Sequence, residues 1–280
     1  MKTPEQLKGT IRNISKKKGL HSQEILQMFL FERVLERLAK SEYKNNFILK
    51  GGLLISDMIG ISERTTMDMD TTIRGLQMEE DAIEDVVKEI ISIDVGDEIL
   101  FKLQKIEPIH EKDAYNNFRI HFNAIYGKMN VPMKIDITTG DIITPSAIEY
   151  SYQMMFEDRT ISIMAYTLET ILAEKYETII RRNIGNTRAR DYYDLYTLFK
   201  IRRDKIRKPL FKLAVESTSK KRNSEELLRE WKDICTEIRK ENALRNLWGN
   251  YIKDNKYAKN LNFDVVAENV LEVAKYLNEE

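Results

Sequence analysis

The periodicity of the apolar residues changes near residue 165, and this change constrains the fold more than any other feature of the chain. Before it, short apolar or alternating runs predict strands, whereas after it apolar residues recur at helical spacing. We expect strands over 46–50, 65–73, 99–107, 118–126 and 132–138, with a hairpin over 148–164. We expect helices over 4–18, 22–40, 53–59, 78–93, 167–183, 187–201, 205–218, 223–247 and 263–278.

This order of elements predicts an α+β protein with two domains. The N-terminal domain, residues 1–165, would hold a mixed β-sheet flanked by helices and would include the N-terminal helices over 4–40. A helical C-terminal domain over 166–280 would follow it and complete a cleft.

Composition excludes several classes of protein. The 45 basic and 45 acidic residues give no net charge, which removes the simplest argument for nucleic-acid binding. The single cysteine, Cys235, cannot form an internal disulfide, and no Cys/His group has zinc spacing. The N-terminal segment lacks an apolar signal core and no stretch is long enough to span a membrane, so we expect a cytoplasmic protein.

The segment Arg64-Thr65-Thr66-Met67-Asp68-Met69-Asp70 is the first candidate for chemistry. On a strand, Arg64, Thr66, Asp68 and Asp70 would share one face, and Met67 and Met69 would point into the core. Two carboxylates so close repel each other unless a divalent cation lies between them, and carboxylate oxygens suit Mg²⁺. Taken alone, the motif more often marks a solvated edge strand.

A second acidic strand pattern is Met133-Lys134-Ile135-Asp136-Ile137, in which Lys134 and Asp136 share the polar face. If this strand lies beside the first, Asp136 becomes a third carboxylate of one metal site, as in two-metal phosphoryl transfer. The alternative is a surface Lys/Asp pair of little consequence.

Candidates for phosphate binding, and for a general base, lie in three further places. Gly51-Gly52 separates a predicted strand from a helix, where the backbone can approach a phosphate closely, although a plain turn is the more frequent explanation. Lys175 falls on the apolar stripe of its helix and must either extend to solvent or meet a negative group. Asp191 would complement the dipole of the next helix, or act as a general base beside Lys175.

In chain order these segments read Gly-Gly, Arg-x-Thr-x-Asp-x-Asp, Lys-x-Asp, a helical Lys, and Arg-x-Arg-Asp. This set resembles the AbiEii/AbiGii family of nucleotidyltransferase toxins, within the DNA polymerase β-like nucleotidyltransferase superfamily. The resemblance covers roughly residues 45 to 200, and the combination in this order is more specific than any one motif.

The resemblance implies a role for each motif. Asp68, Asp70 and Asp136 would bind Mg²⁺ or Mn²⁺. Gly51, Gly52, Arg64, Thr66, Lys134 and Arg188 would bind the nucleoside triphosphate. Lys175 would contact its phosphates, and Asp191 would match the acidic residue of the fourth motif. Many relatives carry Thr or Ser where this chain has Leu53, so Ser56, one turn on, is the candidate hydroxyl here; Arg190 stands where Lys is more frequent.

The expected reaction moves a nucleoside monophosphate from a triphosphate to an acceptor, with release of pyrophosphate. Asp191 or Asp136 would be the general base. The resemblance implies an RNA acceptor, such as a transfer RNA, or a protein acceptor, and a cognate antitoxin in a toxin–antitoxin or abortive-infection system. Basic stretches at 181–182, 202–208 and 220–222 could contact a nucleic acid, or could be solvated surface balanced by nearby acids.

Two other functions remain open at this stage. A nucleotide-binding regulator without turnover would keep the glycine pair and Lys175 but need fewer carboxylates. A DNA-binding regulator would use the helices over 4–18 and 22–40 as a helix-turn-helix, but the broad apolar stripe of the second helix counts against an exposed recognition face.

Overall fold

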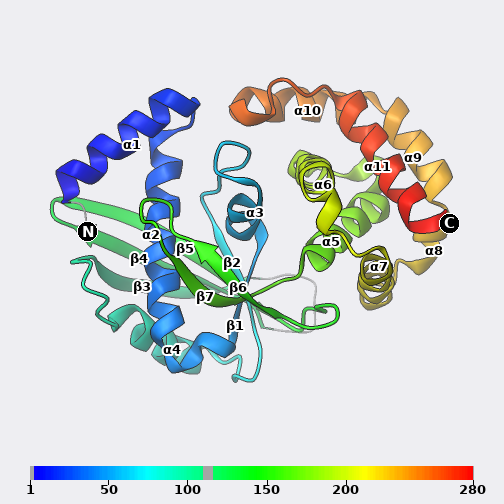
Figure 1. Ribbon diagram of the computed structural model, residues 1–280. Helices are drawn as coiled ribbons and strands as arrows, with labels where there is room; N and C mark the ends of the chain where they lie inside the picture. Colours follow the sequence, from blue (N-terminus) through cyan, green and yellow to red (C-terminus); the bar gives the residue numbers. More distant parts are fainter. Residues whose placement is uncertain (1–2, 110–115, 280) are drawn as a thin grey trace. The chain divides into compact units, whose positions relative to one another are not determined.

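The computed structural model describes residues 3–109 and 116–279. It divides into two compact units: residues up to Asp141 with Ala147–Ala165, and Ile142–Ser146 with the chain from Tyr166 onward. A mixed sheet with flanking helices makes up the first unit, and helices make up the second (Figure 1). The expectation of an α+β fold with a helical C-terminal region is therefore confirmed.

The first unit contains four α-helices and seven strands among its described residues. The helices are α1 (Pro4–Lys18), α2 (Ser22–Lys40), α3 (Gly51–Ile59) and α4 (Glu80–Ser92). The strands are β1 (Phe47–Lys50), β2 (Met69–Ile73), β3 (Leu100–Pro108), β4 (Phe118–Tyr126), β5 (Met129–Thr139), β6 (Ile148–Gln153) and β7 (Thr160–Ala165).

The strands form one mixed sheet in the order β3-β4-β5-β2-β1-β7-β6. β2 runs parallel to β5 and β1 runs parallel to β7, whereas the other neighbours are antiparallel. β1 and β2, which are joined through α3, therefore lie at the centre, and the acidic strands β2 and β5 are direct neighbours.

One face of the sheet forms the apolar core of this unit. Alternate residues of the central strands, among them Met69, Ile135 and Ile137, face α2 and α4. Figure 1 shows α2 lying across the strands, and its residues from Met28 to Leu38 are all buried. That burial leaves this part of α2 no exposed face with which to read DNA, which argues against the helix-turn-helix alternative.

The strand expected over 65–73 is shorter than predicted, because β2 begins only at Met69. Thr66 closes a turn before it: its hydroxyl accepts from the Asp68 N–H at 3.2 Å and lies 3.1 Å from the Asp68 carbonyl oxygen. The alternation predicted for this segment therefore fails at Met67, which is 38% exposed, and holds at Met69, which is 2% exposed. A hydroxyl that hydrogen-bonds to the backbone two residues further along favours a turn over the hydrogen bonds of a β-sheet.

The second unit is helical throughout its described secondary structure. It comprises α5 (Leu168–Arg182), α6 (Ala189–Ile201), α7 (Lys208–Arg222), α8 (Glu225–Arg229), α9 (Trp231–Lys240), α10 (Asn242–Asp254) and α11 (Phe263–Asn278). Aromatic residues of its helices, including Tyr192, Tyr193, Trp231 and Trp248, are buried in its core.

The single helix expected over 223–247 is wrong, because the chain forms α8, α9 and α10 there. Glu241 leaves the helical conformation at ψ 117° and caps α10 by accepting the Ala243 N–H. At about 100° per residue, Ile238 and Leu244 would point about 120° apart on one straight helix. The break allows both side chains to be buried.

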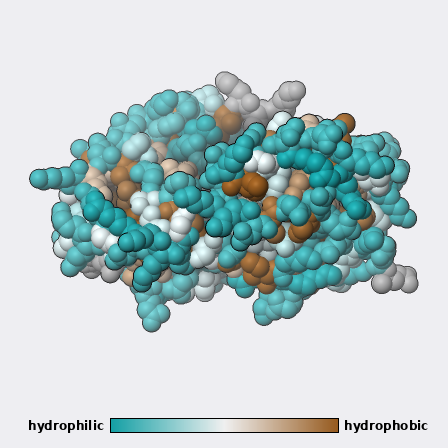
Figure 2. Space-filling model, turned by 90° about the horizontal axis from the view of Figure 1, so that it is seen from above, coloured by the Kyte–Doolittle hydropathy of each residue, from teal (hydrophilic) through white to brown (hydrophobic). Residues whose placement is uncertain are grey.

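The surface in Figure 2 is mainly hydrophilic, with apolar residues in small separate groups. Large apolar residues with more than a third of their surface exposed, such as Leu100 and Ile184, come from different elements. Within residues 3–109 and 116–279, no helix combines the length and apolarity that crossing a membrane requires.

Candidate active site

A row of four charged residues crosses the polar face of the central sheet. Lys50 on β1 pairs in register with Asp70 on β2, Asp70 pairs with Asp136 on β5, and Asp136 pairs with Arg119 on β4. Registered neighbours point to the same face and their strands lie about 4.8 Å apart. The structure therefore brings Asp70 and Asp136 side by side, between two cations. We call Lys50, Asp70, Asp136 and Arg119 the charged row.

Basic side chains neutralise the acids of this face. Arg119 donates to both oxygens of Asp136, each at 2.8 Å, and this hydrogen bonding raises the pKa of the guanidinium. The Nζ of Lys134 lies 2.9 Å from Oδ1 of Asp68, as an ion pair without hydrogen-bond geometry. Asp68 lies just before β2 and about one-third of its side chain is exposed. Its carboxylate therefore remains open to a ligand.

The glycine pair packs directly against the acidic strand. Gly51 begins α3 with φ 68°, a left-handed conformation that favours glycine. A Cβ at Gly51 would collide with the carboxylate of Asp70, and its distance to the carboxyl carbon would be 2.8 Å. A Cβ at Gly52 would lie 2.8 Å from the Thr66 hydroxyl. The backbone at the start of α3 therefore approaches the acids as closely as the absence of side chains allows.

Two of the candidate nucleotide-binding side chains support the loop before β2 in this structure. Ser56 is fully buried and its hydroxyl donates to the carbonyl oxygen of Arg64. Arg64 is 1% exposed and donates to the carbonyl oxygen of Thr65. The two side chains hold the loop that carries Thr66 and Asp68 against α3.

Lys50, at one end of the charged row, is anchored by the segment that follows β5. Its Nζ donates to Asp141 at 2.6 Å and to Thr138 at 2.7 Å. Burial would raise the pKa of Asp141, but the charge of Lys50 and hydrogen bonds from Lys50 and Thr138 lower it overall. Lys50 is therefore fixed at the edge of the acid pair.

A second polar cluster lies in the helical unit. Lys175 on α5 donates to Asp191 at 2.7 Å and lies 3.2 Å from Asp194, both on α6. Asp191 is 5% exposed and Asp194 is fully buried. The lysine on the apolar stripe thus meets negative groups, and Oδ2 of Asp191 is a buried acceptor with no hydrogen-bond donor among the described residues. An oxygen in this state can accept a hydrogen bond from a ligand.

Arginines surround this cluster. Burial, and then the nearby charges of Arg188 and Arg181, lower the pKa of Arg182, so these guanidinium groups repel one another. Arg188 is exposed at the N-cap of α6, where its N–H donates to Asn186 at 2.9 Å. Mutually repelling cations near one end of a helix favour an anionic ligand.

The residues of the first unit fit a hard divalent cation by donor type. Asp70 and Asp136 offer carboxylate oxygens from adjacent strands and Asp68 from the residue before β2, while the backbone of Gly51 approaches the Asp70 carboxylate closely. Across the part of the chain that the structure describes, no three His, Cys, Asp or Glu side chains are yet grouped as ligands. The ion pairs with Arg119 and Lys134 account for this, because they direct two of the carboxylates toward nitrogen.

Sequence reasoning missed Arg119, Lys50 and Asp194. Arg119 and Lys50 join the row only through strand register, which no local pattern of the sequence contains. Asp194 could have been predicted from the sequence, because its spacing of three residues from Asp191 places both side chains on one helix face.

The comparison with solved structures concerns the fold. The structure is similar to JHP933 from Helicobacter pylori, with TM-score 0.52 and 15% identity over 93% of this chain and 94% of that one. It is more distantly similar to a candidate nucleotidyltransferase from H. pylori, with TM-score 0.48 and 15% identity over 93% of this chain and all of that one. An antigenic nucleotidyltransferase-like protein from Paracoccidioides brasiliensis matches with TM-score 0.37 and 12% identity over 95% of this chain and 94% of that one. The similarity to JHP933 supports the α+β fold over nearly the whole chain.

The sequence then identifies the family. Residues 33–269 match the model of the nucleotidyl transferase AbiEii toxins of type IV toxin–antitoxin systems. Because the match spans most of the chain, the protein belongs to this family, as the motif order predicted. Comparison with curated protein sequences finds no match.

Proposed function

We propose that the protein is a metal-dependent nucleotidyltransferase that acts as the toxin of a toxin–antitoxin or abortive-infection pair. It would transfer a nucleoside monophosphate from a triphosphate to an RNA, such as a transfer RNA, or to a protein, in the cytoplasm. Its antitoxin would be a separate protein. The observation that carries the proposal is the register that sets Asp70 beside Asp136, with the backbone of Gly51 against Asp70.

Asp68, Asp70 and Asp136 would hold Mg²⁺ or Mn²⁺. The bound ion would neutralise these acids together with the triphosphate and polarise the reacting phosphoryl group. Arg119 and Lys134, which neutralise the acids in its absence, would then be released toward phosphate oxygens. The N–H groups at the start of α3 would donate hydrogen bonds to the phosphate oxygens of the same triphosphate.

In the reaction, an acceptor hydroxyl loses its proton to Asp136 or Asp191 and its oxygen forms a bond to the α-phosphorus. The bond from that phosphorus to the bridging oxygen breaks, and pyrophosphate leaves with the bonding pair. Lys175 and Arg188 would contact phosphate oxygens, since their cluster combines cations with a buried acceptor on Asp191. Positioning and charge stabilisation would supply most of the rate.

The test is a transfer assay with each labelled triphosphate, Mg²⁺ and total cellular RNA or protein. Asp70→Asn should abolish labelling while leaving the melting temperature close to that of the wild type. Asp85→Asn, on the exposed face of α4, is the matched control and should label normally. Equal labelling by the Asp70→Asn variant and the wild type would remove the proposal.

One observation favours a second candidate, a nucleotide-binding regulator without turnover. Asp136 and Asp68 already have basic partners, so the acids could be structural. Triphosphate affinity measured with and without Mg²⁺ separates the two functions. An enzyme should bind more tightly with the ion, whereas a regulator that uses only the glycine pair and Lys175 should bind equally well without it.

A further inference from the structure

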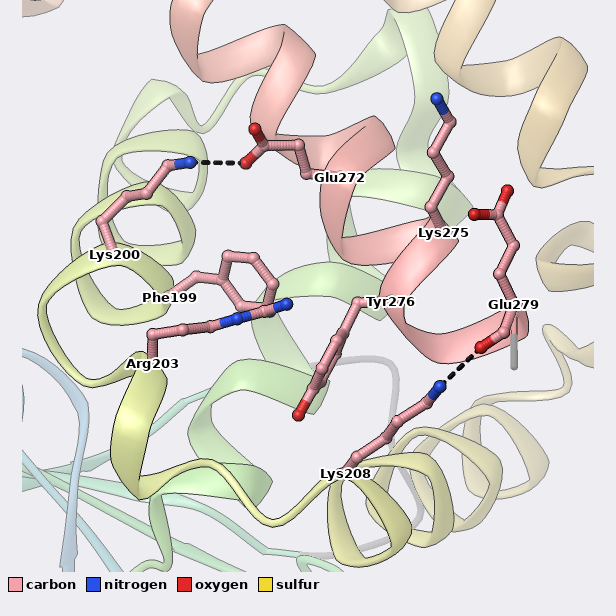
Figure 3. Close-up of a pocket in the computed structure, with 8 residues that line it drawn as sticks. All are labelled: Phe199, Lys200, Arg203, Lys208, Glu272, Lys275, Tyr276 and Glu279. Carbon is pink, nitrogen blue, oxygen red and sulfur yellow. Dashed lines mark hydrogen bonds and ion pairs between the residues drawn. The ribbon is translucent and has the colours of Figure 1, made fainter.

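A basic pocket of about 510 Å³ lies in the helical unit, between the end of α6, the start of α7 and the end of α11 (Figure 3). Its lining includes Lys200, Arg203, Lys208 and Lys275, against two acids, Glu272 and Glu279. Two aromatic rings complete it. The volume is within the range of small-molecule and nucleotide sites.

Arg203 is held flat in this pocket by its aromatic neighbours. Its guanidinium carbon lies 3.8 Å from the ring centroid of Tyr276 and 4.1 Å from that of Phe199. The two rings meet edge to face at 5.5 Å, and the guanidinium lies in the corner between them (Figure 3). These cation–π contacts position the guanidinium without using its N–H donors, so the donors remain available to a ligand.

The acids of the pocket make no close ion pair with Arg203 among the described residues, although, against the effect of burial, its charge is the weakest of those that lower the pKa of Glu272. Glu272 accepts from Lys200 at 2.6 Å and from Asn269 at 3.1 Å, so it is already engaged. Within residues 3–109 and 116–279, Arg203 forms no ion pair. Lys208 donates to the carbonyl oxygen of Glu279 at 2.5 Å, which directs its charge toward the same space.

The local backbone adds to this positive potential at one side. Lys208 is the first residue of α7, a helix of 15 residues with no acid in its first turn. Lys200 and Lys275 stand in the last turns of α6 and α11, where they offset the negative ends of those helices. Arg203 and Lys208 are therefore the two cations of the pocket whose charge is not used to offset the negative end of a helix.

We propose that this pocket binds a phosphate group, with Arg203 as a bidentate donor and Lys208 as the second cation. The group could belong to an inorganic or nucleoside polyphosphate, or to the backbone of an RNA strand. A preorganised guanidinium beside an ammonium group recognises phosphate geometry. The two rings flank the guanidinium at roughly a right angle, so the ligand would contact its N–H groups on the side away from the rings.

The experiment measures binding rather than turnover, so it can succeed or fail independently of the proposed transfer activity. Full-length wild type, Arg203→Gln and Lys208→Gln are titrated with inorganic triphosphate by calorimetry, and with a labelled single-stranded RNA oligonucleotide by anisotropy at several salt concentrations. Lys205→Gln is the matched control, because this exposed residue of the same turn carries the same charge and does not line the pocket.

Each pocket variant should lose roughly tenfold in affinity, as expected for a lost charge-assisted hydrogen bond. For RNA, the slope of log affinity against log salt should also fall by about 0.7 for each lost phosphate contact. Loss for triphosphate alone assigns the pocket to a small molecule, loss for RNA alone assigns it to a strand, and loss for both assigns it to the phosphate group itself. Affinities for both probes equal to that of Lys205→Gln would overturn the proposal. If Arg203→Gln does not fold, Arg203→Lys takes its place. This variant keeps the positive charge but loses the paired N–H donors, so it should also bind the probes more weakly than Lys205→Gln does.

Discussion

Glu32, on the buried helix α2, should make the stability of the first unit fall as the pH rises. Its carboxylate is 1% exposed and accepts the N–H of Met155 at 3.0 and 3.1 Å. The neighbouring Arg33 is shared with Glu36 at 3.3 Å and Glu157 at 2.7 Å. Burial raises the pKa of Glu32 from 4.5 to about 8, and the nearby acids Asp57 and Glu157 add to this, despite the Met155 hydrogen bond and the charge of Arg33.

The direction in which stability changes with pH follows from the protonation of Glu32 in the folded and the unfolded chain. Below pH 4.5 both forms hold the proton, so Glu32 costs nothing. Between pH 4.5 and about 8 the unfolded chain ionises while the folded chain stays protonated, so stability declines with rising pH. At about 1.36 kcal/mol per pH unit, the loss is complete above pH 8 and amounts to about 5 kcal/mol.

Glu32→Gln removes this titration and keeps one acceptor for the Met155 N–H. We expect the difference in the free energy of unfolding between the variant and the wild type to shift by about 4 kcal/mol in favour of the variant as the pH rises from 5 to 8. Urea unfolding followed by circular dichroism at each pH measures this difference. Both tryptophans, Trp231 and Trp248, lie in the helical unit, so their fluorescence is an internal reference that should not change.

Glu42→Gln, which removes an exposed carboxylate of the same unit, is the matched control and should follow the wild type at every pH. If the stability of Glu32→Gln also parallels that of the wild type from pH 5 to pH 8, then Glu32 ionises normally and the reasoning is refuted.

Three further perturbations test the sites. Gly51→Ala should cost roughly 1–2 kcal/mol for its left-handed backbone, and more for the collision with Asp70, and should lower transfer activity; unchanged melting and activity would contradict the close packing. Asp191→Asn should lower transfer activity at least tenfold in the labelled-nucleotide assay, and full activity would remove its proposed role. Asp97→Leu should destabilise the first unit by roughly 3–5 kcal/mol in urea unfolding, because it leaves Arg37 buried without its partner at 2.7 Å; a loss below 1 kcal/mol would show that solvent reaches this pair.

Matched controls accompany the first two of these variants. Gly9→Ala, in the middle of α1 with no heavy atom near its added Cβ, should leave stability unchanged or raise it by about 1 kcal/mol. Asp204→Asn changes a carboxylate that is 71% exposed and should transfer at the wild-type rate.

The sequence predicted the acidic pair better than its surroundings. Alternation placed Asp136 and Lys134 on one face, and the motif order singled out Asp70. That β2 and β5 are neighbours is a property of strand order, which depends on contacts between residues far apart in the chain. For the same reason the partners Arg119 and Lys50 could not be found in advance.

Local geometry caused the other misses. The Thr66 hydroxyl competes with the sheet for the backbone of Asp68, so periodicity alone placed the start of β2 too early. The break at Glu241 has no glycine or proline to signal it. It arises because Ile238 and Leu244 must reach one core from two directions, a demand that only the folded helical unit imposes.

The ion pairs on the polar face of the sheet have a consequence for how the protein is handled. Arg119 and Lys134 offset the charges of Asp136 and Asp68. Treatment with a chelator should therefore leave the melting temperature unchanged. The first unit should then stay folded in buffers that hold no divalent ion, whatever the outcome of the transfer assays.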